Sequence, residues 1–595
     1  MQPAATLAPV LTPDADGFYH PVDEDQVAAL VRMARHRGLQ VRVRGSAHSE
    51  AAAIFSDAKL RGAGEAVDLV LDLLDGVRFD ERRLQVSVAA GCRFGHDPRD
   101  RSGRATEARG LCAQLEARGW ALPVLAGVSH QTIAGFFATG SCGGSLQHAL
   151  DRAIVGLRLI DGTGLLHVLT PTTAPALFAA AGVSLGLLGI VVGVTLQCEP
   201  RYDIIGEEAI TSRCDAAVDL FADDGPRCLA EFLRAHAYAR LLWWPQPGVD
   251  KLVVWTARRA PGEPGECRPY QAFPRVLGSD VLVQRFAGLG MRGLDVWHTA
   301  AQALPRPLRA ATDPLRGALV NAFVPSDPAG PQQFRDVWWR GLPMDNQIDE
   351  RVMPVDFVEV WLPISRAAEA MRRLRALYEQ TGWDLAVNAP IEVYAGADSR
   401  FWLSPGHGGD RVRINVFWPR FNREDPRAGS FAAHVACLAD LGARFHWAKH
   451  VPASFDQAQA RAAYPEWQEF LRLRAALDPD QLFLTARWRH ITGVAPAGAA
   501  GRQCRPLRLA STANDGPQAP VLPPMSDHPG PLRTLSITTL AAAGALFLIF
   551  APDLLAILTA QLEPWCWALV LILGYLVARY LVRMPTTARS VHHWR

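Results

Sequence analysis

Apolar and polar positions alternate in short stretches along the chain. Between residues 23 and 38, apolar side chains recur at helical spacing and Gly38 ends the pattern, so we predict an amphipathic helix. Residues 41–44 (Val-Arg-Val-Arg) alternate apolar and basic positions, which predicts a half-buried strand. The same reasoning predicts strands at 69–72, 84–88, 155–160 and 355–364, and helices at 110–118, 176–181 and 365–380.

Glycine-rich segments interrupt these elements. The first, residues 45–49 (Gly-Ser-Ala-His-Ser), follows the predicted strand at once. Taken alone it is typical of a surface turn. The second, residues 127–145, is rich in glycine and small hydroxyl residues but also carries Ile133 and Phe136, which argues against a flexible linker. Small residues leave backbone N–H groups exposed, and successive N–H groups bind anions such as phosphates. Together the two segments favour phosphate binding, with His48 next to the bound anion.

Composition excludes several classes of function. The chain has 595 residues and a net charge of +2, with basic and acidic residues interleaved, whereas a nucleic-acid-binding protein has a clustered basic excess. Its ten cysteines are scattered, with no CxxC pair and no spacing typical of zinc, so we expect free thiols and no metal site. Residues 1–19 lack the pattern of a secretory signal.

The C-terminal region has a different composition. Residues 494–532 are rich in proline, alanine and glycine, which predicts a flexible linker. Two apolar runs, 535–550 and 565–582, follow, and a helix needs about 20 residues to cross a bilayer. We therefore predict a transmembrane helical hairpin at 533–585; the alternative is a helix pair buried in a soluble core. Arginines flank the hairpin on both sides and are absent from its turn, so both termini should face the cytoplasm of a bacterial-type inner membrane.

The order and spacing of 45–49, 127–145 and 177–200 resemble the FAD-binding domain (PCMH type) of the vanillyl-alcohol-oxidase superfamily. Residues 17–493 as a whole resemble its sugar-lactone and alditol oxidases, the branch of D-arabinono-1,4-lactone oxidase. Further motifs carry this resemblance: Arg-Leu-Leu-Trp-Trp-Pro at 240–245, Glu-Val-Tyr at 392–394, Trp-Leu-Ser-Pro at 402–405 and Phe-His-Trp-Ala-Lys at 445–449, which matches the family's His-Trp-x-Lys.

The resemblance implies an α+β fold. A two-subdomain FAD-binding domain would span 1–200, a substrate domain on an antiparallel sheet 201–450, and a return to the flavin side 451–493. The implied activity is oxidation of an alcohol group of a sugar lactone, alditol or related carbohydrate by hydride transfer to FAD. Oxygen or a membrane acceptor would take the electrons. Two alternatives stay open: an oxidase of a lipid-linked sugar, and a flavin-binding protein that has lost turnover.

The resemblance also implies the cofactor site. His48 matches the loop histidine that bonds covalently to the flavin, and Ser129 stands where some members have a second, cysteine link. Ala47 replaces the usual glycine, and its methyl group is tolerated readily only at negative φ. Cys142 replaces a common histidine, and we expect it to pack. The implied cofactor-binding residues are Arg44, Gly45, Ser46, Ala47, His48, Ser49, Gly127, Thr132, Gly135, Thr139, Gly140, Ser141, Cys142, Gly143, Gly189 and Ile190.

Four residues are the implied catalytic candidates. Lys449 would act as base or as stabilising cation, because a desolvated lysine can have a depressed pKa. His446 would orient the substrate or the lysine. Glu392 would bind substrate hydroxyls, and Tyr394 would lie beside it, because side chains two apart on a strand share a face. The family has arginine at the position of Tyr394, so a bidentate partner is lost there and the substrate is left open.

Overall fold

The computed structural model describes residues 12–100, 102–262, 267–272, 280–302, 304–326, 330–348, 353–420, 422 and 424–496. The chain divides into two compact units, Met1–Ala497 and Gly498–Arg595, and all described residues belong to the first. Nearly all of the predicted linker (494–532) and the whole predicted hairpin (533–585) lie outside the described residues. Among the described helices, none combines the length and apolar character that a bilayer crossing requires.

The N-terminal part contains two small layers of strands. The predicted first helix is confirmed as α1 (Glu24–Arg37), which Asp23 caps and which ends at Gly38 with φ +65°. β1 (Val41–Arg44) follows and pairs in parallel with β2 (Val67–Val70). A separate antiparallel sheet has the strand order β3-β4-β8-β6-β7. Its strands are β3 (Val77–Asp80), β4 (Gln85–Ala89), β6 (Ile154–Ile160), β7 (Leu166–Leu169) and β8 (Ile190–Gln197).

Short helices connect and cover these strands. They are α2 (Ala51–Ile54), α3 (Asp57–Arg61), α4 (Leu111–Glu116), α5 (Ile133–Ala138) and α6 (Pro175–Ala181). Two short strands, β5 (Trp120–Ala121) and β9 (Glu199–Pro200), form an antiparallel pair at the end of this part of the chain. The predicted strands and helices of this region are thus present, with ends that differ by two residues or fewer.

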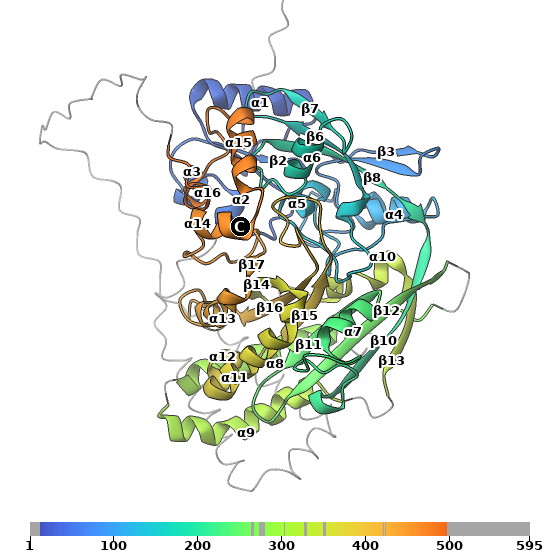
Figure 1. Ribbon diagram of the computed structural model, residues 1–595, viewed down its shortest axis with the longest axis vertical. Helices are drawn as coiled ribbons and strands as arrows, with labels where there is room; N and C mark the ends of the chain where they lie inside the picture. The colour runs from blue at the N-terminus through green and yellow to red at the C-terminus, as the bar shows by residue number, and fades with distance from the viewer. Residues whose placement is uncertain are drawn as a thin grey trace, which may run out of the picture. The chain divides into compact units, whose positions relative to one another are not determined.

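An eight-stranded antiparallel sheet forms the middle of the chain, in the order β13-β10-β12-β11-β15-β16-β14-β17 (Figure 1). The predicted mixed fold with an antiparallel sheet is therefore confirmed. The strands are β10 (Tyr202–Ser212), β11 (Tyr238–Trp244), β12 (Lys251–Pro261), β13 (Gln332–Val337), β14 (Val355–Pro363), β15 (Ile391–Gly396), β16 (Arg411–Pro419) and β17 (Arg444–Phe445).

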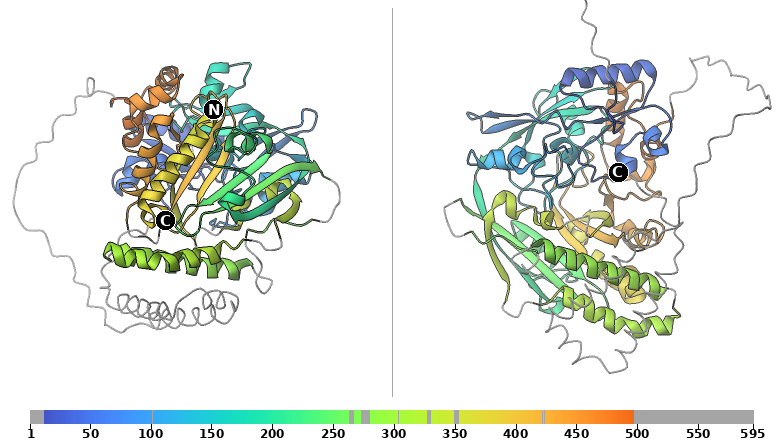
Figure 2. Two further views of the ribbon diagram at one scale, coloured as in Figure 1. Left: turned by 60° about the horizontal axis from the view of Figure 1, so that its bottom comes forward. Right: turned by 180° about the vertical axis from the view of Figure 1, so that it is seen from behind.

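Helices pack on this sheet and beside it. On the sheet lie α7 (Leu229–Ala235), α11 (Ala367–Thr381) and α13 (Ser430–Leu438), with α13 against β14 and β16. Two longer helices, α8 (Asp280–Gln302) and α9 (Arg306–Phe323), lie side by side and are the long green pair in Figure 2. The sequence patterns gave no prediction for this pair.

The C-terminal helices return to the first part of the chain. α14 (Gln457–Ala463), α15 (Trp467–Leu477) and α16 (Ala486–Thr492) are the orange helices that lie beside the blue ones in Figure 1. The Val41 N–H donates to the Leu482 carbonyl at 2.9 Å, which fixes β1 to this tail.

A cluster of buried aromatic rings joins the tail to the predicted His-Trp-x-Lys motif. The Trp447 ring stacks on Tyr464 at 5.3 Å and on Trp467 at 6.5 Å between centroids, and Trp488 packs on it as well. The Trp447 indole N–H donates to the Leu403 carbonyl at 2.7 Å. The tryptophan of the motif is therefore a core residue whose packing fixes the positions of its neighbours His446 and Lys449.

Candidate active site

One cavity touches three of the segments predicted to bind the cofactor. It lies beside β1 and β2 and has a volume of about 950 Å³ including its open mouth. The predicted residues on its wall are Arg44, Gly45, Ser49, Thr132, Gly135, Thr139, Gly189 and Ile190. The fold thus gathers segments that are far apart in the sequence around one space.

Two glycines allow close backbone packing at this cavity. A Cβ atom on Gly45 would lie 2.2 Å from Thr132 Oγ1, and one on Gly189 would lie 2.3 Å from the Ile160 carbonyl oxygen. Gly189 also has φ +147°, a conformation that side chains disfavour. Thr132 caps α5 by accepting from the Gly135 N–H at 3.3 Å. Glycine at position 45 is therefore what lets the loop after β1 lie directly against the start of α5.

Ala47 has an unfavourable backbone conformation. Its φ is +56°, in the left-handed region. The backbone therefore does not adopt the negative φ at which a methyl group is readily tolerated. For an L-residue other than glycine this conformation costs roughly 1–2 kcal/mol. The loop keeps the geometry that suits glycine although the residue is alanine.

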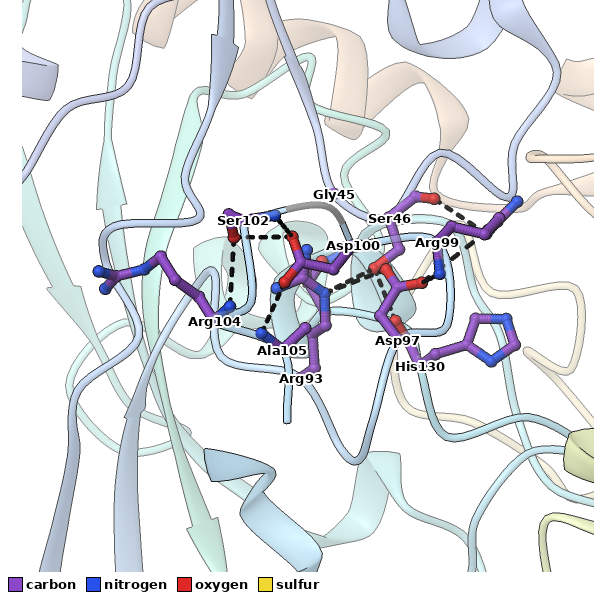
Figure 3. A network of polar contacts seen from close by, with 12 residues as sticks. Gly45, Ser46, Arg93, Asp97, Arg99, Asp100, Ser102, Arg104, Ala105 and His130 are labelled. Atoms are coloured by element: carbon purple, nitrogen blue, oxygen red, sulfur yellow. Dashed lines mark hydrogen bonds and ion pairs between the residues drawn. The ribbon is translucent and has the colours of Figure 1, made fainter. Parts of the chain in front are cut away.

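A polar network surrounds Ser46, in the loop that carries His48, as Figure 3 shows. The Arg99 guanidinium contacts His48 Nε2 and donates to the Ser46 carbonyl at 3.0 Å. Ser46 Oγ accepts from Arg93 Nε at 3.2 Å and donates to the His130 carbonyl at 2.6 Å. The His130 ring lies 4.1 Å from the His48 ring between centroids. His48 is thus held from several sides, by contacts that no sequence motif indicated.

The side chains that hold the His48 loop come from the loop after β4. Asp97, only 4% exposed, pairs with Arg93 at 3.3 Å and with Arg99 at 3.9 Å. Asp100 accepts hydrogen bonds from Ser102 Oγ and the Ala105 N–H, both at 2.8 Å. Burial raises the pKa of Asp100, but these hydrogen bonds outweigh it and lower the pKa below its usual value. The Asp97 carboxylate therefore keeps Arg99 directed at the His48 loop, and Asp100 fixes the loop that carries Arg99.

A backbone hydrogen bond joins the His48 loop to the Lys449 turn. The Glu50 N–H donates to the Ala448 carbonyl at 2.8 Å. The Glu50 carboxylate pairs with Arg487 at 3.0 Å, and Arg487 in turn donates to the Lys449 carbonyl at 3.5 Å. The Lys449 ammonium lies 3.9 Å from the centroid of the Phe357 ring. The two predicted reactive residues, far apart in the sequence, are therefore on adjoining loops.

His446 is buried and neutral. Its Nδ1 accepts from the Ala448 N–H at 3.2 Å, so the proton of the neutral ring is on Nε2, which lies 3.0 Å from Ser141 Oγ. Burial, together with the nearby charges of Lys449 and Arg413, lowers the pKa of His446 to about 4, although Glu359 acts in the opposite direction. His446 therefore connects the lysine turn to the predicted flavin segment at Ser141.

Glu392 and Tyr394 lie on one face of β15, as predicted from their spacing. Glu392 is 4% exposed and accepts from Asn415 Nδ2 at 2.7 Å. Burial and the negative charge of Asp345 raise the pKa of Glu392 to about 7, against the opposing effect of Arg240. The Tyr394 hydroxyl donates to Asp345 Oδ2 at 3.4 Å. A carboxyl group that titrates near neutrality thus lies on the sheet face that carries the predicted substrate site.

Two arginines that were not among the predicted site residues flank Tyr394. Arg240 on β11 and Arg413 on β16 are its direct partners in the sheet register. Arg240 forms an ion pair with Asp345, and Arg413 forms one with Glu359 at 3.1 Å. Both arginines were visible as charged positions within apolar strands, but only the strand order places them beside Tyr394.

Four of the other predicted cofactor residues lie together at a second cavity. This cavity, of about 440 Å³, is lined by Gly140, Ser141, Cys142 and Gly143, among others. Burial raises the pKa of the Cys142 thiol to about 11, which leaves it neutral. A Cβ atom on Gly127 would lie 2.1 Å from Asp345 Oδ2. Ser129 accepts from Asn346 Nδ2 at 2.8 Å.

Comparisons with known proteins bear on this site. The family model of D-arabinono-1,4-lactone oxidase matches residues 347–491. The L-gulonolactone oxidase of Bos taurus is 23% identical over 478 residues, 79% of this chain and 93% of that protein. The D-arabinono-1,4-lactone oxidase of Eremothecium gossypii is 32% identical over 255 residues, 42% of each chain. The L-gulono-1,4-lactone dehydrogenase of Mycobacterium tuberculosis is 25% identical over 487 residues, 80% of this chain and 95% of that protein.

The protein is an FAD-dependent oxidoreductase that acts on CH–OH groups. The sequence prediction of this enzyme class is thereby confirmed. In its fold this oxidoreductase is similar to the crystal structure of cholesterol oxidase from B. sterolicum, with a TM-score of 0.57, 15% identity, and coverage of 80% of this chain and 93% of that one.

The cavity of this oxidoreductase fits FAD. Glycine-rich segments line it, and the close packing at Gly45 and Gly189 exposes backbone where a side chain would fill the space. Arg44 and Arg93 stand on its wall and supply positive charge for a pyrophosphate. Arg93 was not predicted from the sequence, because nothing in its neighbourhood forms a recognisable motif.

We expect Ala47→Gly to stabilise the protein by about 0.5–1 kcal/mol, because glycine removes the strain of the positive φ and only partly offsets this by a more flexible unfolded chain. Urea unfolding followed by tryptophan fluorescence measures the change. Ala376→Gly, in the exposed middle of α11, is the matched control and should destabilise by a similar amount. A loss of stability in Ala47→Gly would contradict the strained loop.

We expect Glu392→Gln to change how stability depends on pH. The folded protein holds the Glu392 proton more tightly than the unfolded chain, so the wild-type free energy of unfolding should fall as the pH rises from 4.5 to about 7. The variant has no titrating carboxyl group at position 392, so its free energy of unfolding should fall less over the same pH range. Urea midpoints at pH 5, 6, 7 and 8 measure the difference, and parallel curves for the two proteins would contradict the raised pKa.

Proposed function

We propose that the protein oxidises an alcohol group of a sugar lactone, alditol or related neutral carbohydrate, with FAD bound covalently through His48 and with oxygen or a membrane acceptor taking the electrons. The observation that carries the proposal is the hydrogen bond between Glu50 and Ala448. It brings the predicted flavin-linking histidine and the predicted catalytic lysine together at one junction. The lactone specificity of the relatives supports the substrate class.

The side chains have distinct roles in this proposal. FAD, when bound, supplies the acceptor for the hydride that leaves the carbinol carbon. Lys449 stabilises the alkoxide that develops as the hydroxyl proton leaves, or takes that proton. Glu392, with a pKa near 7, hydrogen-bonds substrate hydroxyl groups in either protonation state. Neutral His446 holds Ser141 with the proton on Nε2.

The charges around the site favour a neutral substrate. Each of the two buried arginines is matched by a carboxylate, Arg240 by Asp345 and Arg413 by Glu359. A phosphate group needs donors that point at it, and the guanidinium donors of these arginines point at carboxylates and backbone carbonyls instead. A hydroxyl-rich lactone or polyol therefore suits the site better than the phosphate-linked sugar of the alternative, lipid-linked substrate.

Membrane attachment is a further part of the proposal. The apolar runs within 533–585 and the arginines around them support a helical hairpin that tethers the enzyme to a bacterial-type inner membrane, with the catalytic part on the cytoplasmic side. A tether of this kind would bring the flavin close to a quinone-type acceptor.

We expect His48→Ala to release the flavin. After acid precipitation, the pellet of the wild-type protein should stay yellow, whereas the variant should leave its colour in the supernatant. His130→Ala is the matched control, because the His130 ring packs on His48 but is not predicted to bond to the flavin. This variant should keep the colour in the pellet. Colour that stays with precipitated His48→Ala would disprove the attachment site.

We expect Lys449→Met to lower kcat by about 10²–10⁴ while the flavin stays bound, because proton transfer and alkoxide stabilisation are lost. Bleaching of the flavin absorbance by lactones and polyols without air measures the half-reaction. Lys59→Met, which changes a lysine packed on Phe18, should bleach within about twofold of the wild-type rate. If no carbohydrate bleaches the wild-type flavin, the protein is instead a flavin-binding protein without turnover.

A further inference from the structure

Three residues in register cross the middle of the large sheet at the candidate site. Arg240, Tyr394 and Arg413 occupy directly opposed positions on β11, β15 and β16. They are 4%, 6% and 7% exposed. The Arg413 guanidinium lies 5.0 Å from the centroid of the Tyr394 ring, a cation–π contact in a water-poor setting. A neutral ring therefore separates two buried guanidinium groups.

The tyrosine ring supports the predicted flavin segment. A Cβ atom on Gly144 would lie 2.7 Å from Tyr394 Cδ1 and 3.0 Å from the Ala239 carbonyl oxygen. The backbone at 144 is therefore pressed onto the ring. A side chain of different shape at position 394 would move this segment.

The two arginines are held differently. Arg240 pairs with Asp345 and lies 3.9 Å from Glu208, so carboxylates surround it. Arg413 donates to the carbonyl oxygens of Cys142 at 3.2 Å and Gly143 at 3.4 Å. Arg413 is thus the arginine that donates to the segment predicted to face the flavin, at Cys142 and Gly143.

Glu359 connects Arg413 to the lysine turn. Its carboxylate accepts from Arg413 Nε at 3.1 Å and from the Trp361 indole N–H at 2.8 Å, and its carbonyl accepts from the His446 N–H at 3.2 Å. Burial raises the pKa of Glu359, but Arg413, His446 and Lys449 outweigh it and lower the pKa below its usual value. Arg413 thus stays fixed between the predicted flavin segment and the turn of Lys449.

The positive charge that the resemblance places on β15 is therefore present on the next strand. A third guanidinium at position 394 would have a like charge on each side at sheet spacing, which is unfavourable in a buried setting. A phenol ring at 394 avoids this repulsion and accepts the cation on its face.

We propose that Arg413 is a positioning residue that holds the Cys142–Gly143 backbone against the flavin and supplies the buried positive charge that favours electron transfer to it. The proposal rests on the proposed FAD site. On this proposal the cation has moved from position 394 to Arg413 on the neighbouring strand. The tyrosine at position 394 therefore does not mark an enzyme that has lost its activity.

The test uses the full-length protein with its flavin bound and sulfite as a probe, because sulfite adds to an oxidised flavin more tightly when positive charge is near. We expect Arg413→Met to weaken sulfite binding by about tenfold or more, in line with the loss of a charge-assisted interaction. The flavin midpoint potential should become more negative. Arg413→Lys should fall between the variant and the wild type.

The decisive experiment moves the cation from Arg413 to the neighbouring position 394. Tyr394→Arg alone should lower the melting temperature and the flavin content, because three guanidinium groups would be adjacent. The double variant Tyr394→Arg with Arg413→Met restores one cation beside Arg240, and its sulfite affinity should recover to within about threefold of the wild type. No recovery, with flavin bound, would overturn the proposal.

Arg444→Met is the matched control for loss of a buried arginine. Arg444 lies in the same row of the sheet, is 6% exposed and also donates to backbone carbonyls, at Pro405 and His407. It should reduce thermal stability without changing sulfite affinity. Equal sulfite affinity in Arg413→Met and the wild type would overturn the inference while the flavin site stands. A wild-type protein that retains no flavin would overturn the proposed function itself.

Discussion

The hydrogen bond from the Glu50 N–H to the Ala448 carbonyl is the constraint on which the active-site arrangement depends. It joins a loop of the N-terminal part to a turn that follows the last strand of the large sheet. Burial raises the pKa of Glu50, but His450 and Arg487 outweigh this effect and lower it. The ionised carboxylate therefore supports the same junction from its side chain. The contact places the loop of His48 beside the turn of Lys449.

Paired charges give the site its chemical character. Buried ion pairs contribute little net stability, because the cost of removing both partners from water offsets their attraction. Their value here is that they fix direction. Arg99 is held at His48 by Asp97, and Arg413 is held at the Cys142 carbonyl by Glu359. Arg99 and Arg413 are thus oriented donors at the His48 loop and at the Cys142–Gly143 segment, and oriented donors are what electrostatic stabilisation of developing charge requires.

The strained loop at Ala47 and the pair of arginines around Tyr394 illustrate one principle. In both places the residue departs from the pattern that the resemblance leads one to expect, and the surrounding structure decides the consequence. The backbone keeps a positive φ at Ala47, and the sheet register supplies cations beside Tyr394. A substitution at one position of a motif therefore says little until its neighbours in space are known.

The sequence by itself determined most of the local elements and pointed to segments that line the cavity. Alternation predicted β1 and β14, helical spacing predicted α1, and the glycine-rich segments supply part of the cavity wall. These features depend on neighbouring residues, whose spacing is written directly in the chain. Only the tertiary structure decided that Arg99 contacts His48, that Arg413 lies beside Tyr394 and that Glu50 bonds to Ala448. Such contacts follow from strand order and from the packing of distant segments, and no local pattern encodes them.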